Sequence, residues 1–540
     1  MTNTLQSQGV LERLKGHGPL AELGRRLARA DFPVDIAEAE GSFASVVVAY
    51  LDRELAGRPG PGAGKAAGAS GKAVGAPGKA ASAAGKGTAQ GALLVVAATD
   101  QEAESLASDL GLLGIPAELL PWWHTAAYRP VSTRARAFGE RAAVLSRLLM
   151  GEARVVVASQ RAFVTPLPPP EVFGPLVFSI DVGGEIDPAK VGERLASYGY
   201  LRVPRVSLPG EFALRGEVLD LFMPGDDEAV RVVFDYDHVD RISAFEPAGQ
   251  AGLRSLERVL VRPMKEIIWD EARLATLAAV APGLPNCQGR VEGLLEELGE
   301  KGEARGEELW YPLAWDKPAS ILDYLGEGGL VVFLDHERLE AQEESARKEY
   351  AGLYRNALKE GAVPPPDRLL HSFMALEAGW ERKIRDYALN DKDSEGRLRL
   401  GAEPPRSFFG NVQYFKEELA SLIKAGYEVR IFAETEPQAE RITALLKDYK
   451  VLVQAAGISA GFSIPAMKLL VVQEGEIFGR RKRVPKSVKS ARSATIDSFV
   501  ELNPGDFVVH VNYGIGRFAS IERMKVLGNE RDYIKVEYAD

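Results

Sequence analysis

The sequence has almost no cysteine. Cys287 is the only one among 540 residues. A single thiol excludes a disulfide framework and a zinc site built from cysteines, and it is typical of proteins in a reducing compartment. We therefore expect a cytoplasmic protein with no metal site of this kind.

Long apolar runs and an excess of positive charge are also missing. No run of about 18 apolar residues occurs, and the amino-terminal stretch has no apolar signal core, so neither export nor a membrane partner is expected. The formal net charge of −10 argues against a chain whose whole surface follows a phosphate backbone, although a local basic patch is compatible with it. We expect the partners to be mainly proteins.

Residues 57–91 depart from the ordinary globular composition of the rest, with eleven glycines and four Gly-Lys pairs spaced by seven residues. A phosphate-binding loop needs another glycine five residues before the Gly-Lys pair and a Ser or Thr after it. None of the four copies has either. This composition cannot bury apolar surface, so we predict a disordered linker inserted into a folded domain.

Buried strands alternate with helices in the first part of the chain. "GSFASVVVAYLDREL" (41–55) predicts a helix, and "ALLVVAATD" (92–100) predicts a buried strand that runs into the helix "QEAESLASDLGLL". "ARVVVASQRAF" (153–163) predicts a second buried strand. Strand, helix and strand in this order indicate an α/β unit with a parallel sheet.

The pattern changes near residue 178 and then returns. "GEVLDLFMPG" (216–225) and "VRVVFDYDHVDRISAFEP" (230–247) alternate apolar and polar residues, which indicates an antiparallel α+β insert. Residues 328–350 read as a buried strand followed by a charged helix, and residues 417–446 as helix, strand and helix. A chain of 540 residues is too long for one core and predicts roughly three to five domains.

The carboxy-terminal part begins with a basic run, "GRRKRVPKSVKSARS" (479–493), which we interpret as a solvated linker; nucleic-acid contact is the alternative. The last stretch alternates apolar and polar residues between glycine turns, as in a small β-barrel. "YIKVEYAD" (533–540) ends like a strand entering a turn, so we expect this barrel to lack its final strand.

Three phrases together resemble the bacterial transcription-repair coupling factor family. They are "SYGYLRVPRVSLPGEFALRGEVLDLFMPG" (197–225), "GISAGFSIPAMKLLVVQEGEIFG" (457–479) and "GDFVVHVNYGIGRF" (505–518). The first is similar to the insert shared with the excinuclease component UvrB, and the second to the family's third domain. The third is similar to the RNA-polymerase-interacting domain, also found in CarD-type regulators. The resemblance spans roughly residues 90–540.

The resemblance implies a multidomain α/β and α+β fold. Its parts are a degenerate RecA-like (UvrB-type) α/β domain with an α+β insert, a second small α/β domain, and a carboxy-terminal SH3/Tudor-like β-barrel. The expected segments are 1–175 and 266–390 for the UvrB-like domain, 176–265 for the UvrA-binding insert, 391–478 for the third domain, 479–499 for the linker and 500–540 for the barrel.

The function implied is that of the amino-terminal half of a transcription-coupled DNA repair factor, which binds stalled RNA polymerase through its β subunit and recruits UvrA. In the intact family an ATP- and magnesium-dependent DNA translocase follows the barrel and displaces stalled polymerase. The motifs of that translocase do not occur in these residues, so we expect this chain to bind no cofactor. We expect DNA contact mainly through the translocase. Whether this chain is an enzyme stays open. The alternatives are a CarD-like RNA-polymerase-binding regulator and a UvrB-like repair ATPase.

The ATPase alternative depends on the segment that matches the phosphate loop of UvrB, residues 41–45. This segment has no lysine to neutralise the phosphates, so Gly41 and Ser45, with Asp335 at the position of the magnesium-holding acid, form a degenerate, non-functional nucleotide site. Asp335 is alternatively a helix cap. The stretch 121–145 is too short for the DNA-gripping hairpin of UvrB, and we interpret its aromatic residues Trp122, Trp123 and Tyr128 as packing residues rather than base-stacking ones.

The resemblance assigns UvrA binding to the insert, at Arg202, Arg205, Arg215 and Phe222. Exposed arginines beside an apolar residue are typical of a protein-protein hot spot, because arginine pairs with carboxylates through two hydrogen bonds. For any one arginine the alternative is a structural salt bridge. For Phe222 it is a place in the core.

The resemblance assigns RNA-polymerase binding to the terminal stretch, at His510, Val511, Tyr513, Ile515 and Arg517. We expect strand pairing with the polymerase, with Val511 and Ile515 as apolar anchors. His510 has no nearby serine, cysteine or metal-ligand partner in the sequence, so we interpret it as a turn residue rather than a catalytic one.

Overall fold

The structure is a computed structural model. It describes residues 9–10, 12–39, 41–56, 91–123, 128, 135–284, 290–304, 306–326, 328–360, 363–387, 396–406, 408, 410–479, 507–510, 514–526 and 529–537. The expected linker lies outside the described residues except for Gly91, and the expected basic linker lies outside them except for Gly479. The described residues up to 479 belong to one compact unit and those from 507 onward to a second.

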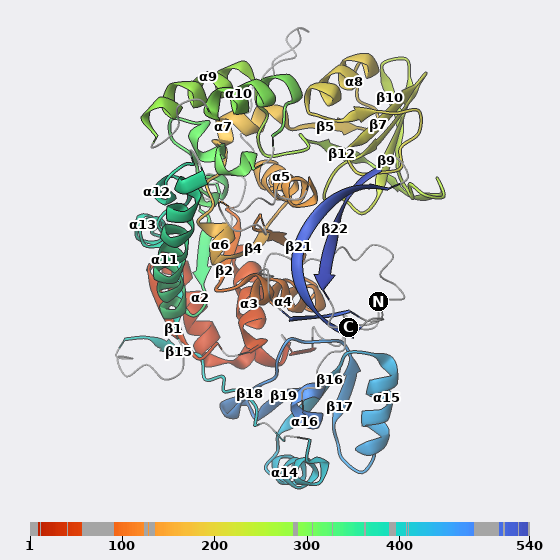
Figure 1. Ribbon diagram of the computed structural model, residues 1–540. Helices are drawn as coiled ribbons and strands as arrows, with labels where there is room; N and C mark the ends of the chain where they lie inside the picture. Colours follow the sequence, from red (N-terminus) through yellow and green to blue (C-terminus); the bar gives the residue numbers. More distant parts are fainter. Residues whose placement is uncertain are drawn as a thin grey trace, which may run out of the picture. The chain divides into compact units, whose positions relative to one another are not determined.

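A seven-stranded, all-parallel sheet forms the centre of the first unit (Figure 1). The predicted strands at 92–100 and 153–163 are confirmed and are neighbours in it. In spatial order the strands are β15 (Leu398–Arg399), β1 (Val34–Ala37), β14 (Lys383–Tyr387), β13 (Leu330–Phe333), β2 (Leu93–Ala97), β4 (Val155–Ser159) and β3 (Ala117–Leu120).

Helices cover both faces of this sheet, because alternate residues of each buried strand point to opposite sides. Leu93 and Val95 belong to one apolar cluster and Leu94 and Val96 to another. The first cluster includes residues of α2 (Gly18–Arg29), α3 (Phe43–Ala56) and α4 (Asp100–Leu112); the second includes residues of α5 (Ala135–Leu149), α6 (Gln160–Phe163), α11 (His336–Glu360) and α13 (Phe373–Gly379).

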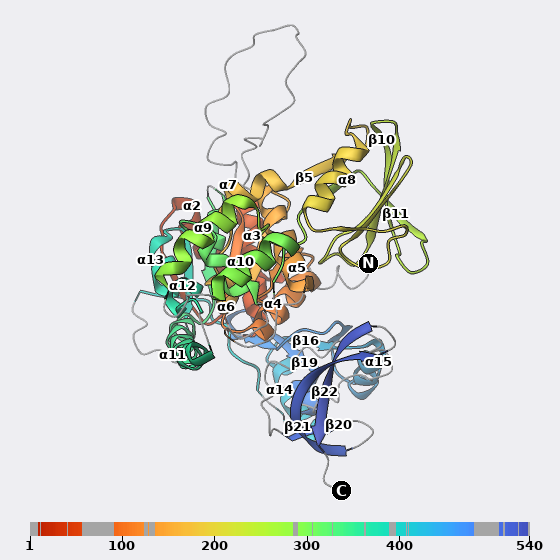
Figure 2. The same ribbon diagram turned by 45° about the horizontal axis from the view of Figure 1, so that its top comes forward.

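The predicted insert is an antiparallel α+β element between two paired strands, β5 (Phe178–Asp181) and β12 (Arg258–Val261). Figure 2 shows its six-stranded sheet with α8 (Pro188–Ser197) beside it. The strand order is β11 (Gly252–Leu256), β10 (His238–Phe245), β9 (Ala229–Asp235), β8 (Val218–Phe222), β7 (Glu211–Arg215) and β6 (Leu201–Arg202). Only the β6–β7 pair is parallel, and β6 lies at an edge.

A helical segment, which the sequence did not predict, joins the insert to β13. It contains α9 (Glu271–Val280) and α10 (Arg290–Lys301), followed by short 3-10 turns. Its apolar residues pack around Trp269, Tyr311 and Trp315 together with Trp123 and Phe138. Besides the helices named elsewhere, the described part of the first unit contains the short helices η1 (Leu14–Gly16), α7 (Pro170–Phe173), η3 (Gly174–Leu176), η4 (Ala281–Gly283), η5 (Glu307–Leu309), η6 (Tyr311–Leu313), η7 (Ile321–Tyr324), α12 (Pro366–Leu369) and η8 (Pro465–Met467).

A second, four-stranded sheet makes the small α/β domain. Its order is β17 (Leu452–Ala455), β16 (Glu428–Ala433), β19 (Leu469–Gln473) and β18 (Phe462–Ile464), and only β18 is antiparallel to its neighbour. The helices α14 (Val412–Lys424), α15 (Glu436–Leu445) and α16 (Glu474–Phe478) share a core with it. The helix, strand and helix predicted for 417–446 are therefore confirmed.

The second unit contains three described antiparallel strands, β20 (Phe507–His510), β21 (Gly514–Val526) and β22 (Asn529–Glu537), with β21 in the middle. The alternating pattern thus forms strands as expected, whereas closure into a barrel stays a prediction. In the described part of the chain, no helix is both long and apolar enough to cross a membrane.

Candidate interaction surfaces and nucleotide position

The predicted UvrA-binding arginines lie at one edge of the insert sheet. Arg202 is exposed in the edge strand β6, and Arg205 is exposed in the loop that follows, with its Nη2 donating to the Ala248 carbonyl at 3.1 Å. Arg215 ends the neighbouring strand β7 and is also exposed. The structure therefore brings all three onto strands β6 and β7 and the loop between them.

Arg215 is held by a buried carboxylate. Its Nη2 donates to Asp220 Oδ2 at 2.8 Å, and Asp220 also accepts from Arg231 Nε at 2.6 Å and Nη2 at 2.9 Å. The Asp220 side chain is 0% exposed, while that of Arg215 is 51% exposed. Arg215 is thus fixed at one end and open to a partner on the other, so the salt-bridge and hot-spot interpretations are both compatible with its position.

Phe222 lies in the core. It is 8% exposed and packs with Val206, Ala213, Ala229 and Phe245. This position matches the alternative interpretation, in which Phe222 is a core residue. Any contribution of Phe222 to UvrA binding would be indirect, through the packing of β8.

Two exposed leucines next to the arginines were not predicted. Leu201 precedes Arg202 and is 64% exposed, and Leu208 is 63% exposed in the loop before Gly210. The Leu208 N–H donates to Glu211 Oε2, which holds the loop against β7. The "SLPG" turn (207–210) was the signal that could have located Leu208, because surface turns leave their side chains outside the core.

The predicted nucleotide residues lie at the carboxyl edge of the seven-stranded sheet. Gly41 follows β1 and precedes α3, with φ +57°, and Ser45 lies in the first turn of α3. Asp335 follows β13, which is separated from β1 by β14. In an open parallel sheet this edge is where ligands bind, so the topology agrees with the expected location.

The chemistry of these residues does not favour a nucleotide. The Ser45 hydroxyl donates to the Ser42 carbonyl at 2.6 Å, so it is used at the start of its own helix. The Asp335 carbonyl accepts from the Arg338 and Leu339 N–H groups at the start of α11. Among the described residues, no group of three or more His, Cys, Asp or Glu side chains is placed to hold a metal ion.

A buried carboxylate lies next to this position. Asp109 of α4 accepts from the Ser459 backbone N–H at 2.9 Å and from the Ser459 hydroxyl. Burial raises the pKa of Asp109 to about 6, although both hydrogen bonds from Ser459 act in the opposite direction. The ionised form of Asp109 is therefore less stable in the folded chain than in the unfolded one.

This shift predicts that Asp109→Asn stabilises the first unit at neutral pH. Because the folded pKa lies above the unfolded value of 3.8, wild-type stability falls as pH rises from about 4 to about 6. Asparagine escapes this loss, so we expect a gain of about 3 kcal/mol at pH 7.5 that vanishes near pH 4. Urea unfolding at several pH values measures it, with exposed Glu104→Gln on the same helix as a control; a constant difference across pH would contradict it.

The aromatic residues of 121–145 pack as interpreted. Trp122 and Trp123 are buried, and the Tyr128 hydroxyl donates to the Pro364 carbonyl at 2.6 Å. Trp123 Nε1 donates to Glu266 Oε1 at 3.0 Å, and Glu266 also pairs with Arg141 at 2.9 Å. Neither tryptophan is available for stacking on bases.

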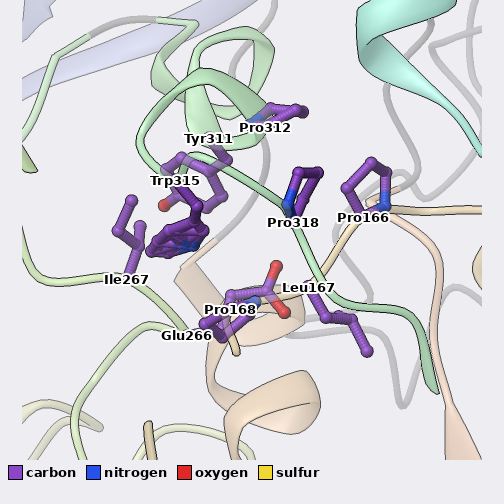
Figure 3. A pocket seen from close by; sticks show the side chains of 9 residues that line it. All are labelled: Pro166, Leu167, Pro168, Glu266, Ile267, Tyr311, Pro312, Trp315 and Pro318. Carbon is purple, nitrogen blue, oxygen red and sulfur yellow. The ribbon is translucent and has the colours of Figure 1, made fainter. Parts of the chain in front are cut away.

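A small pocket opens beside Glu266. Figure 3 shows Trp315 and the proline rings of Pro166, Pro312 and Pro318 around it, with the Glu266 carboxylate at its base. The cavity has a volume of about 10 Å³, which is room for one water molecule. It is therefore a packing feature rather than a ligand site.

The predicted polymerase-binding residues lie around the β20–β21 connection. His510 ends β20 and pairs with Gly514, Ile515 pairs with Val509, and Arg517 is exposed in β21. Val511 and Tyr513 lie outside the described residues. Among the described strands β20 pairs only with β21, and strand pairing with the polymerase stays a prediction.

Two regions of the chain match models of known domains. The model of the UvrB interaction domain matches residues 178–267, and that of the CarD-like/TRCF RID domain matches residues 502–540. The transcription-repair-coupling factor of Bacillus subtilis (strain 168) is 30% identical over 436 residues, which covers 74% of this chain and 37% of that protein. We identify the chain as a relative of the transcription-repair-coupling factors.

Other transcription-repair-coupling factors give the same picture. That of Borreliella burgdorferi is 26% identical over 455 residues, covering 83% of this chain and 40% of that protein. That of Staphylococcus epidermidis RP62A is 25% identical over 435 residues, covering 74% and 37%. The chain thus spans less than half the length of these relatives.

The two domain matches fall on separate structural elements. The UvrB interaction domain match begins at β5, ends six residues after β12, and contains Arg202, Arg205 and Arg215. The other match contains β20, β21 and β22. The two regions that match these domain models are therefore the insert and the second unit.

Proposed function

We propose that this chain is a recruitment module of transcription-coupled DNA repair, which binds UvrA through the insert and RNA polymerase through the second unit. The observation that carries the proposal is the coincidence of the UvrB interaction domain match, residues 178–267, with a sheet edge that exposes Arg202, Arg205 and Arg215. Arginines of this kind, with neighbouring exposed leucines, are the usual composition of a binding hot spot.

The seven-stranded domain is, in this proposal, a degenerate RecA-like domain of the UvrB type, with the boundaries 1–175 and 266–390. Its parallel sheet, its helices on both faces and the loop between β1 and α3 support that assignment. Residues 176–265 and 391–478 are the UvrA-binding and third domains. The residues of 500–540 would form an SH3/Tudor-like barrel that contacts the polymerase β subunit along β20.

ATP-driven movement on DNA and displacement of stalled polymerase belong, in this proposal, to other segments of a longer protein. The support is that the chain covers only 37–40% of the first relatives. The degenerate residues Gly41, Ser45 and Asp335 would hold neither ATP nor magnesium. A UvrB-like ATPase is therefore the weaker candidate.

The test is a calorimetric titration of the full chain with purified UvrA. We expect binding that Arg202→Glu and Arg215→Glu each weaken at least tenfold, because a reversed charge repels the carboxylates that arginine would pair with. Arg241→Glu is the matched control, since Arg241 is also exposed on this sheet, in β10. We expect it to bind like the wild type.

The same preparation is titrated with the β subunit of RNA polymerase. Polymerase binding without any binding of UvrA would remove the repair part of the proposal and leave a CarD-like regulator. Arg202→Glu is the more direct variant, because Arg215→Glu also places a second carboxylate next to Asp220. Loss of UvrA binding in the control Arg241→Glu as well would show that the effect is not specific to Arg202 and Arg215.

A further inference from the structure

The nucleotide position of the seven-stranded domain is in contact with a loop of the small α/β domain. Residues 456–461 connect β17 to β18, and Ser459, Ala460 and Gly461 lie against the turn that leads into α3. These two segments are more than 400 residues apart in the sequence, since the Ser42–Ala460 separation is 418.

Polar contacts fix this loop from two helices. The Ser42 hydroxyl donates to the Ala460 carbonyl at 2.6 Å, immediately before α3. The Ser459 backbone N–H donates to Asp109 of α4 at 2.9 Å, and the Ser459 hydroxyl donates to the other carboxylate oxygen. The Gly461 N–H donates to Glu476 Oε1 at 2.8 Å, which holds the loop to its own domain. Because the partners are largely buried, leaving any of them unpaired is costly.

Gly41 shows how closely the loop approaches. A Cβ atom on Gly41 would lie 2.4 Å from the Gly461 carbonyl oxygen, closer than any carbon can approach it. Gly41 also has φ +57°, a conformation that favours glycine. The close approach to Gly461 and the positive φ both occur at Gly41 without a phosphate. The glycine of the degenerate loop therefore has a role in contacting Gly461.

The apolar core is continuous across the same contact. The rings of Phe43, the first residue of α3, and Phe462, the first residue of β18, lie 5.2 Å apart. Both are fully or almost fully buried and belong to one apolar cluster with residues of the two sheets. The remaining cavity, lined by Ser42, Ser45, Asp109 and Phe462 among others, has a volume of about 30 Å³, room for about two water molecules.

We propose that residues Ser459–Phe462 fill the nucleotide position of the seven-stranded domain. The loop thereby excludes nucleotides from this position and holds the small α/β domain against the seven-stranded domain. In this arrangement the site at α3 is an interdomain contact and has no exchangeable ligand. The inference does not depend on the recruitment function, because it concerns neither the insert nor the second unit.

The test is amide hydrogen exchange on the full chain with Gly41→Ala. We expect exchange to rise at least tenfold in residues 456–464 and in the first turn of α3, because the methyl group displaces the Gly461 carbonyl. The matched control is Gly216→Ala. Gly216 has the same φ of +57° but nothing within 4 Å of its added Cβ, so it has the backbone strain without the clash. We expect it to leave both segments unchanged.

A milder variant tests the proposal if Gly41→Ala does not fold. Ser459→Ala removes only the hydroxyl hydrogen bond to Asp109, and we expect a severalfold increase of exchange in the same two segments. Unchanged exchange there in both folded variants would overturn the proposal. So would stoichiometric binding of ATP and magnesium to the wild-type chain, which a closed position does not allow.

Discussion

Replacing Glu266 by alanine is expected to destabilise the first unit by about 3–5 kcal/mol, the usual cost of leaving a buried charge without its partner. The side chains of Arg141 and Glu266 are 0% and 1% exposed. Arg141 Nε lies 2.9 Å from both carboxylate oxygens, and Trp123 Nε1 donates to one of them. Without Glu266, a guanidinium group would remain inside a core of aromatic rings.

Chemical denaturation monitored by tryptophan fluorescence measures this effect, because Trp123, Trp269 and Trp315 belong to the same cluster. The double variant Arg141→Met/Glu266→Met removes both charges, and we expect it to be more stable than Glu266→Ala. Arg136→Ala on the same helix is the exposed control, since its side chain is 72% exposed, and should cost under about 1 kcal/mol. Equal losses for Glu266→Ala and Arg136→Ala would contradict the buried-pair argument.

Replacing Asp220 by alanine is expected to have two effects together. It should destabilise the insert by about 2–3 kcal/mol, because a fully buried carboxylate that accepts from two arginines is lost. It should also weaken UvrA binding, because Arg215 loses the partner that orients it. The loss of stability is smaller than for Glu266, since Arg215 and Arg231 can reach solvent.

The control is Asp240→Ala, an exposed aspartate of β10 in the same sheet, which we expect to change stability by less than about 0.5 kcal/mol. Thermal unfolding and UvrA titration are measured on both variants. If Asp220→Ala unfolds like the wild type, the network is not stabilising. If it is destabilised but binds UvrA with full affinity, Arg215 is a structural residue and Arg202 is left as the principal candidate.

The strands that were predicted from the sequence are those whose pattern is local. Within "ALLVVAATD", the residues of β2, Leu93–Ala97, are all apolar because β2 lies between two neighbouring strands and under helices on both faces. The alternation in 230–247 follows from a sheet with one buried face. The helical segment at 271–301 was missed because its apolar residues serve a core shared with Trp123 and Phe138, which are distant in the sequence.

The candidate site residues also differ in whether a local sequence pattern can locate them. Arg202, Arg205 and Arg215 are close in sequence and lie together in the structure, so a motif could locate them. Asp220 could not be recognised as their anchor, because strand register decides which side of β8 is buried. The contact between Gly41 and Gly461 joins residues of different domains, and no local pattern in either segment indicates it.

The position of β1 in the sheet has a consequence for synthesis on the ribosome. Among the described strands β1 pairs only with β14 and β15, and Asp35 meets Arg385 across a separation of 350 residues. At typical translation rates of about 5–20 residues per second, β1 waits roughly 20–70 s after its synthesis for its first neighbour, β14. During that interval the insert, whose strands are joined by short connections, can complete its own sheet. Until β14 has been made, the nascent chain is therefore expected to expose β1 without a partner strand, and we expect early chaperone contact at residues 34–56.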